Sequence, residues 1–138
     1  ALLAAYIPML MDSGGNSGSQ SSTTIIRAMS TGEVSAKDWK AVLFKEGKVG
    51  LMVGVILMLV NFIRVLLMDS VGLTVAIIVS MTLAFTVVLA KIIGAVLPMV
   101  AEYFKQDPAV MTGPLLTTVV DTMALLVYFE VSSMFLNL

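Results

Sequence analysis

Apolar residues run in long stretches along this chain, separated by short polar or turn-forming segments. Three stretches, over about 36–68, 71–104 and 109–136, are apolar almost throughout. Each is longer than the ~20 residues that a helix needs to cross the hydrocarbon of a bilayer. A fourth, over about 1–30, is apolar only as far as Met11 and regains helical character from Thr23. The pattern predicts an all-α integral membrane protein, a bundle of four membrane passes in one domain over residues 1–138.

The first of these passes is predicted to be broken. Between Asp12 and Gln20 it holds three glycines and six polar residues, which would be costly against lipid. Irregular backbone at membrane depth is tolerated only against protein or a water-filled path, and interrupted helices are typical of ion and substrate sites. We therefore expect Gly14, Gly15, Asn16 and Gln20 to line such a path.

Asp121 lies near the middle of the last apolar stretch, where an ionised carboxylate costs on the order of 2.5–3.5 kcal/mol on insertion scales. No Lys or Arg occurs between Ala109 and Leu136. The acid therefore needs a compensating partner, and a cation from outside the chain is one. The alternative is a protonated or hydrogen-bonded Asp that joins two helices.

Asp121 belongs to a polar stripe on its predicted helix. Gly113, Thr117 and Asp121 are spaced by four residues, with Pro114 and Thr118 beside them, and residues three and four apart share a helix face. Mg²⁺ gives up its water reluctantly, so one carboxylate among neutral oxygens suits a hydrated ion. One hypothesis is that a two-fold axis beside Asp121 brings two carboxylates to one ion. The alternative is a helix–helix contact lined with threonine.

The composition supports the membrane assignment and excludes several functions. Charged residues make up 12% of the chain and hydrophobic residues 59%, whereas a soluble domain carries about 25% charged residues. The net charge of -1 provides no basic surface for nucleic acid. Without Cys or His, the chain has no disulfide, no thiolate site and neither the commonest catalytic base nor the commonest transition-metal ligand. We therefore expect that the protein is not an enzyme.

Basic residues predict the orientation. Five of them fall between the first and second passes: Arg27, Lys37, Lys40, Lys45 and Lys48. The first and third connections should then face the cytoplasm and both chain ends the outside, with a further pass before Ala1. Glu46 and Asp107 would lie near the cytoplasmic side, where they can contact cations.

Several motifs of one family occur in order along the chain. They are Pro8–Gln20, which reads P-x-L-x-x-x-G-G-N-x-G-x-Q, then Lys45-Glu46 with Val49-Gly50, then Gly94–Pro98, and finally Asp107–Ala109, Gly113–Leu115 and Thr118–Asp121. Together they cover nearly the whole chain, which resembles the MgtE family of magnesium channels.

The resemblance implies a homodimeric, Mg²⁺-selective channel of the bacterial plasma (inner) membrane, with five membrane helices per subunit, the last four of them in this chain. It implies a pore on the dimer axis, lined by the segments 1–30 and 109–136. Asp121 stands where the family has its central Mg²⁺-binding aspartate, Thr117 where a backbone carbonyl helps to hold the hydrated ion, and Gly113 where some members carry Asn. The family's cytoplasmic regulatory domains, a helical domain and a pair of CBS modules, are absent from this chain.

The expected ion is hydrated Mg²⁺, with Mn²⁺ or Ca²⁺ as further candidates. A secondary transporter that exchanges the cation for H⁺ or Na⁺ stays open, because a broken helix suits it equally well. An intramembrane aspartyl protease would need two carboxylates sharing a proton, and Asp12 lacks the sequence setting for that. A purely structural membrane module is the last alternative.

Overall fold

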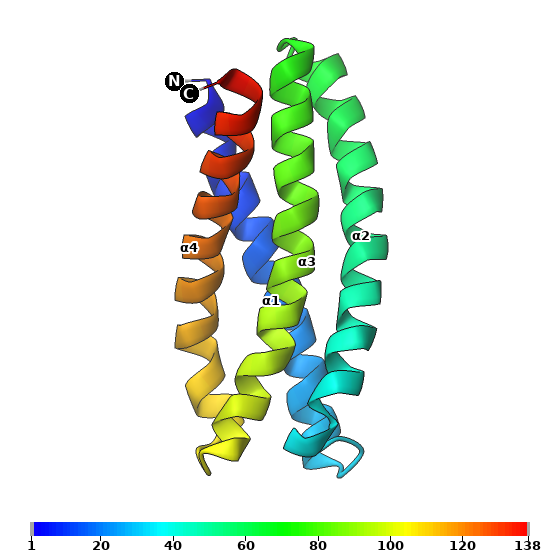
Figure 1. Ribbon diagram of the computed structural model, residues 1–138, viewed down its shortest axis with the longest axis vertical. Coiled ribbons are helices and arrows are strands. Elements are labelled where there is room, and N and C mark those ends of the chain that lie inside the picture. The colour runs from blue at the N-terminus through cyan, green and yellow to red at the C-terminus, as the bar shows by residue number, and fades with distance from the viewer. Residues whose placement is uncertain (1, 138) are drawn as a thin grey trace.

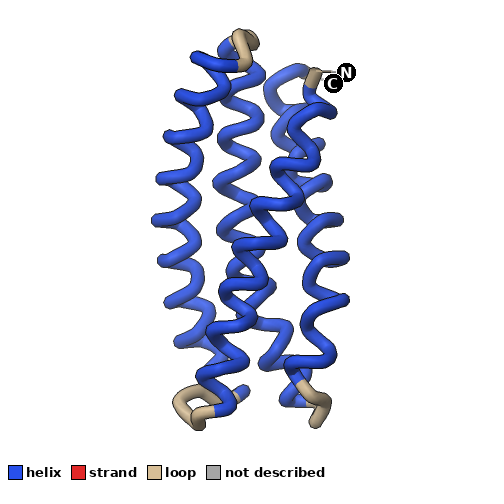
Figure 2. The backbone as a smooth tube through the Cα atoms, turned by 180° about the vertical axis from the view of Figure 1, so that it is seen from behind, coloured by secondary structure: helices blue, strands red, loops and turns tan. Residues whose placement is uncertain are grey.

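The computed structural model describes residues 2–137, apart from the side chain of Met111, so Ala1 of the first predicted helix lies outside it. Its elements are η1 (Leu3–Tyr6), α1 (Ile7–Ser30), η2 (Ala36–Asp38), α2 (Trp39–Met68), α3 (Leu73–Tyr103) and α4 (Pro108–Leu136). The four long helices run up and down in a bundle (Figure 1), and seen from behind, the loops lie at its two ends (Figure 2). We call these the upper and lower ends, as Figure 1 is drawn; both termini lie at the upper end.

Local signals in the sequence place the helix starts at the lower end. Ser35 and Asp38 form a capping box before α2, with the Ser35 backbone N–H donating to Asp38 Oδ2 over 2.8 Å. Asp107 caps α4 by accepting from the Ala109 backbone N–H at 2.8 Å, and Pro108 is the first helical residue. These side chains satisfy N–H groups that have no partner inside the helix.

The first helix is continuous, so the predicted break between Asp12 and Gln20 is wrong. α1 runs unbroken from Ile7 to Ser30 through all three glycines. Gly14 and Gly18 are four residues apart and lie against the other helices. Their lack of a side chain lets α1 approach its neighbours closely, and this packing outweighs the low helix propensity of glycine. The six polar side chains of the segment therefore leave an intact helix rather than a loop.

The third helix lies at the centre of the bundle and packs along the other three. In Figure 1, α1 lies behind α3 and slants from behind α4 at the upper end to α2 at the lower end. Among the described residues, three helices are long and apolar enough to cross a membrane: Ala36–Met68, Leu73–Tyr103 and Thr112–Leu136. Half of the most apolar window of α3 is buried inside the bundle, against 17% for α2 and 28% for α4. A fourth pass through α1 stays a prediction.

Glycines set the closest approaches between helices. A Cβ atom on Gly50 would lie 3.1 Å from Val88 Cα, and one on Gly54 would lie 3.0 Å from the Ala84 carbonyl oxygen. This G-x-x-x-G pair therefore brings α2 close to α3. The crossing of α1 and α3 is tighter still, because a Cβ on Gly94 would overlap the Gly18 carbonyl group.

Candidate functional site

The polar stripe predicted on the last helix lies on the surface of α4. Thr117 and Thr118 are exposed, and Asp121 is half-buried. Gly113, one turn below Thr117, is exposed too, and a Cβ there would have no neighbour within 4 Å. The residues on the other side of α4, Leu116 and Val120 among them, are buried. A polar face within an otherwise apolar span therefore points away from the bundle core.

The threonine hydroxyls on this face donate their protons to the helix itself. Thr117 and Thr118 both donate to the Pro114 carbonyl oxygen, over 3.3 and 3.1 Å, and Thr122 donates to the Thr118 carbonyl oxygen over 2.8 Å. A hydroxyl has one proton and two lone pairs. With the protons engaged, the outward-facing oxygens act as acceptors, which suits water molecules bound to a cation.

A second polar face runs along α1. Asp12, Asn16 and Gln20 are exposed, and the Asn16 side-chain amide donates to Asp12 Oδ2 over 3.1 Å. An open hollow of about 750 Å³ on this face is lined by polar residues: Asn16, Ser19, Gln20, Thr23 and Thr24. Gly15 is half-buried, and a Cβ there would meet nothing within 4 Å. The structure therefore leaves Asn16, Gln20 and Gly15 accessible.

Gly14 differs from the other predicted lining residues because it is buried. A Cβ on Gly14 would lie 2.8 Å from Thr86 Cγ2 and 2.9 Å from Val120 Cγ1, so this residue packs between helices rather than lining a path. A Cβ on Gly18 would lie 3.2 Å from Leu116 Cδ1. The two glycines thus bring α1 against α4 at the level of Asp121, which directly follows Val120.

The two predicted cytoplasm-side acids have different surroundings. Asp107 is exposed and serves as the cap of α4. Glu46 is buried, with only 6% of its surface exposed, and its Oε2 accepts a hydrogen bond from the Ser21 hydroxyl at 2.5 Å. Glu46 therefore connects α2 to α1 inside the lower half of the bundle instead of facing free solvent.

Lys91 was not among the predicted site residues, and it is 6% exposed in the middle of α3. Its Cβ lies 3.6 Å from the position that a Cβ on Gly50 would take, so the glycine leaves room for the base of this side chain. A charge inside a 31-residue apolar helix is itself an unusual feature. That signal was available in the sequence.

A polar network at the upper end was also missed. The Tyr6 hydroxyl donates to Asp69 Oδ2 at 2.8 Å, and Arg64 forms an ion pair with Asp69 at 3.3 Å. Arg64 also donates to Asn61 Oδ1, and the Asn61 amide donates to the Ser80 hydroxyl at 3.2 Å. We call these five residues the upper-end network. It joins η1, α2 and α3, because Tyr6 bonds to Asp69 and Asn61 bonds to Ser80.

The described part of one chain does not supply a complete metal cage. Within residues 2–137, no group of three or more Asp, Glu, His or Cys side chains is placed to hold an ion. The accessible acids near the polar faces are Asp12 on α1 and Asp121 on α4. An ion at these faces would need its own water or a second copy of the chain to complete its coordination.

Comparison with known proteins places the chain in a family. A family model described as a divalent cation transporter, MgtE, matches residues 7–131. The chain belongs to the MgtE family. The magnesium transporter MgtE of Thermus thermophilus is 37% identical to this chain over 141 aligned positions, which cover 98% of the chain. The magnesium transporters MgtE of Bacillus subtilis and Enterococcus faecalis are 29% and 27% identical over 98% and 99% of the chain.

The MgtE relatives are much longer than this chain, which spans about 30% of the length of each. The matched region includes both polar faces, because residues 7–131 contain Asp12 and Asn16 on α1 and Thr117 and Asp121 on α4. Membership of this family and the three apolar helices together identify the chain as a helical membrane protein.

Proposed function

We propose that this chain is the pore-forming membrane part of a magnesium channel and that hydrated Mg²⁺ passes along the polar faces of α4 and α1. The observation that carries the proposal is Asp121, a half-buried carboxylate within the apolar span Thr112–Leu136. An ionised group at that depth is costly unless it is compensated. A passing divalent cation supplies that compensation, and the relatives, which are magnesium transporters, support magnesium as the ion.

The chemistry of the α4 face favours a hydrated ion over a bare one. Mg²⁺ demands a regular octahedron of oxygens and loses water reluctantly. Thr117 and Thr118 point hydroxyl lone pairs outward while their protons are bound to the Pro114 carbonyl. Such oxygens accept hydrogen bonds from the water shell, and Asp121 supplies the attracting charge. The membrane potential adds ~2.3 kcal/mol per charge per 100 mV to the inward driving force.

We propose further that the channel is a homodimer with Asp121 of each subunit beside the two-fold axis. One chain brings a single carboxylate to this level of α4, and two-fold symmetry doubles it without a new residue. The exposed polar face of α1 supports the same arrangement, because polar side chains at membrane depth require water or protein in front of them. The alternative is a secondary transporter that exchanges the cation for H⁺ or Na⁺. That alternative was favoured by a broken first helix, and α1 is continuous.

The experiment is Mg²⁺ flux into liposomes that contain the purified protein. Asp121→Asn keeps the shape of the side chain and removes its charge, and we expect the flux to fall at least tenfold. Glu130→Gln is the matched control, an exposed acid nine residues further along α4, and should leave the flux unchanged. Equal flux in Asp121→Asn and the parent protein would refute the proposal. Single-channel currents separate the channel from an exchanger, which produces none of that size.

A further inference from the structure

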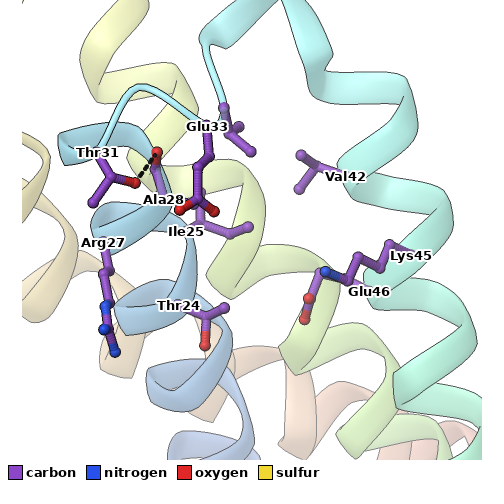
Figure 3. Close-up of a pocket in the computed structure, with 10 residues that line it drawn as sticks. Thr24, Ile25, Arg27, Ala28, Thr31, Glu33, Val42, Lys45 and Glu46 are labelled. Carbon is purple, nitrogen blue, oxygen red and sulfur yellow. Dashed lines mark hydrogen bonds between the residues drawn. The ribbon is translucent and has the colours of Figure 1, made fainter.

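A pocket of about 300 Å³ lies at the lower end between the last turns of α1, the turn that follows it and the first half of α2 (Figure 3). It is distinct from the polar faces of α1 and α4, although Thr24 borders both this pocket and the hollow on α1. Four charged residues line it: Arg27, Glu33, Lys45 and Glu46. Two bases and two acids leave the lining without net charge. A lone cation or a lone anion would each meet two side chains of its own sign, so the lining favours a ligand that carries both charges.

The hydrogen-bonding groups of the pocket refine this choice. The Thr31 hydroxyl donates to the Ala28 carbonyl oxygen over 3.2 Å, and the Thr24 hydroxyl donates to the Gln20 carbonyl oxygen over 2.8 Å. Both hydroxyls therefore offer acceptor lone pairs. Glu46 accepts a hydrogen bond from Ser21 through Oε2, which leaves its Oε1 atom as a second acceptor. Two carboxylates and a threonine oxygen make three acceptors, which match the three N–H donors of a primary ammonium group. A quaternary ammonium has none.

The basic side chains supply the site for the other charge. Figure 3 shows Lys45 and Glu46 reaching from α2 towards α1, with Glu33 across the gap, and Arg27 extending along α1. Lysine and arginine are the ordinary ligands of a phosphate group. The pocket thus presents cationic donors and acidic acceptors within one small volume, as a phosphate ester of ethanolamine requires.

The position of the pocket indicates where such a molecule comes from. Trp39 and four lysines, Lys37, Lys40, Lys45 and Lys48, gather on the first turns of the span Ala36–Met68. Aromatic and basic residues of this kind lie at the level of lipid headgroups. The remaining wall of the pocket is apolar, with Ile25, Val34 and Val42. The ligand class at that level is a phospholipid.

We propose that this pocket binds the headgroup of a phosphatidylethanolamine lipid. Its ammonium donates to Glu33, Glu46 and one threonine oxygen, and its phosphate lies against Lys45. The bound lipid bridges α1 and α2 at the lower end. This proposal does not depend on which ion passes the protein, since it uses none of the residues on the α4 face.

The test is native mass spectrometry of the detergent-purified protein titrated with phosphatidylethanolamine, phosphatidylcholine and phosphatidylglycerol of identical acyl chains. We expect phosphatidylethanolamine to bind about tenfold more tightly than either of the others. Lys45→Met and Glu33→Gln should each remove this preference. Lys48→Met and Glu130→Gln, which change an exposed residue of the same type outside the pocket, should keep it. Free phosphoethanolamine provides a further arm, expected to bind at least tenfold more weakly than the lipid.

Each other outcome overturns the proposal. Equal binding of the three lipids would mean that the pocket does not distinguish their headgroups. Tighter binding of phosphatidylglycerol would mean that the basic side chains bind the phosphate without help from the carboxylates. Loss of the preference in Lys48→Met places the effect outside the pocket. Free phosphoethanolamine binding as tightly as the lipid assigns the pocket to a soluble ligand. The comparison among lipids uses the parent protein, so it stands even where a variant fails to fold.

Discussion

The two ends of the bundle are held together in different ways. At the upper end, a large apolar cluster that includes Tyr6, Leu10 and Tyr128 is joined by the upper-end network and by a 2.7 Å hydrogen bond from the Tyr128 hydroxyl to the Leu3 carbonyl oxygen. At the lower end, the buried apolar cluster is smaller, with Ile25 and Val42 at its centre. Pockets of about 300 and 280 Å³ lie there between α1 and α2 and between α3 and α4. An open hollow of about 450 Å³ also borders Tyr6, Arg64 and Asp69 at the upper end, so the contrast rests on the apolar clusters and the hydrogen bonds.

The difference indicates which parts of the two polar-faced helices are free to move. The Tyr128–Leu3 bond joins α4 to the segment just before α1 at the upper end, and the Tyr6–Asp69 bond joins that segment to the α2–α3 turn. At the lower end, the Ser21–Glu46 bond joins α1 to α2, and α4 begins on its own cap. Regions with fewer buried apolar contacts open at lower free energy. We therefore expect the lower halves of α1 and α4 to open before the upper halves.

The largest effect should come from the crossing of α1 and α3, where the two ends meet. In Gly94→Ala the new Cβ would overlap the backbone carbonyl of Gly18, which cannot rotate away. We expect the free energy of unfolding in detergent to fall by about 4 kcal/mol or more, enough to prevent folding of a marginal protein. Gly47→Ala is the control, because a Cβ there meets nothing within 4 Å. Similar melting temperatures for the two variants would show that the crossing is not the point on which both ends depend.

The next largest effect should come from the upper-end network. Asp69→Ala removes the partner of both the Tyr6 hydroxyl and Arg64. Loss of a hydrogen-bonded charged partner costs about 1–3 kcal/mol, and we expect a loss of that size in thermal unfolding. Glu130→Gln changes an exposed acid outside the network and should cost less than about 0.5 kcal/mol. An unchanged unfolding temperature in Asp69→Ala would show that the upper-end network does not stabilise the upper end.

The corresponding change at the lower end is Ser21→Ala. It leaves buried Glu46 without the hydroxyl that donates to it, so we expect a cost of about 1–2 kcal/mol. Hydrogen exchange sharpens the test, because exchange should rise in the lower half of α1 while the amides near Tyr6 keep their protection. Ser19→Ala, two residues away on the exposed face, should change neither quantity. Faster exchange at both ends would contradict the idea that they open separately.

A smaller effect is expected from Tyr128→Phe, which removes only the bond between the Tyr128 hydroxyl and the Leu3 carbonyl oxygen. A single neutral hydrogen bond contributes about 0.5–1.5 kcal/mol. The measurement is the unfolding temperature, together with hydrogen exchange at the start of α1, and exposed Tyr103→Phe serves as the control. An identical result for the two tyrosines would mean that the apolar cluster alone holds the upper end.

The smallest effect should come from Thr82→Val on α3. The Thr82 hydroxyl is fully buried and has no hydrogen-bond partner among the described atoms. Replacing an unpaired buried polar group with an apolar group of the same shape is nearly neutral or stabilising. We expect a change within about 0.5 kcal/mol, in either direction, in the unfolding free energy. A loss of more than about 1 kcal/mol in the unfolding free energy would contradict this expectation and show that the Thr82 hydroxyl makes a stabilising polar contact.

The features that the sequence alone determined are the local and periodic ones. Apolar length predicted long helices, and α2, α3 and α4 occupy those stretches. The stripe of Gly113, Thr117 and Asp121 also follows from helical spacing, and its members lie on the accessible side of α4. These features depend on residues within a turn or two of one another, so the order of residues is sufficient to reveal them.

Only the tertiary structure decided the rest. It made α1 continuous, because the glycines that are poor helix formers in isolation become contact points when α3 and α4 pack against them. It placed Gly14 in the interior, and it paired Ser21 with Glu46 and Tyr6 with Asp69 across 25 and 63 residues of chain. Such pairs are formed by the way the helices pack. Helix propensity depends on neighbouring residues and contains no information on which helices pack together. The hydrogen bonds that join the helices at both ends of this bundle therefore follow only from the tertiary structure.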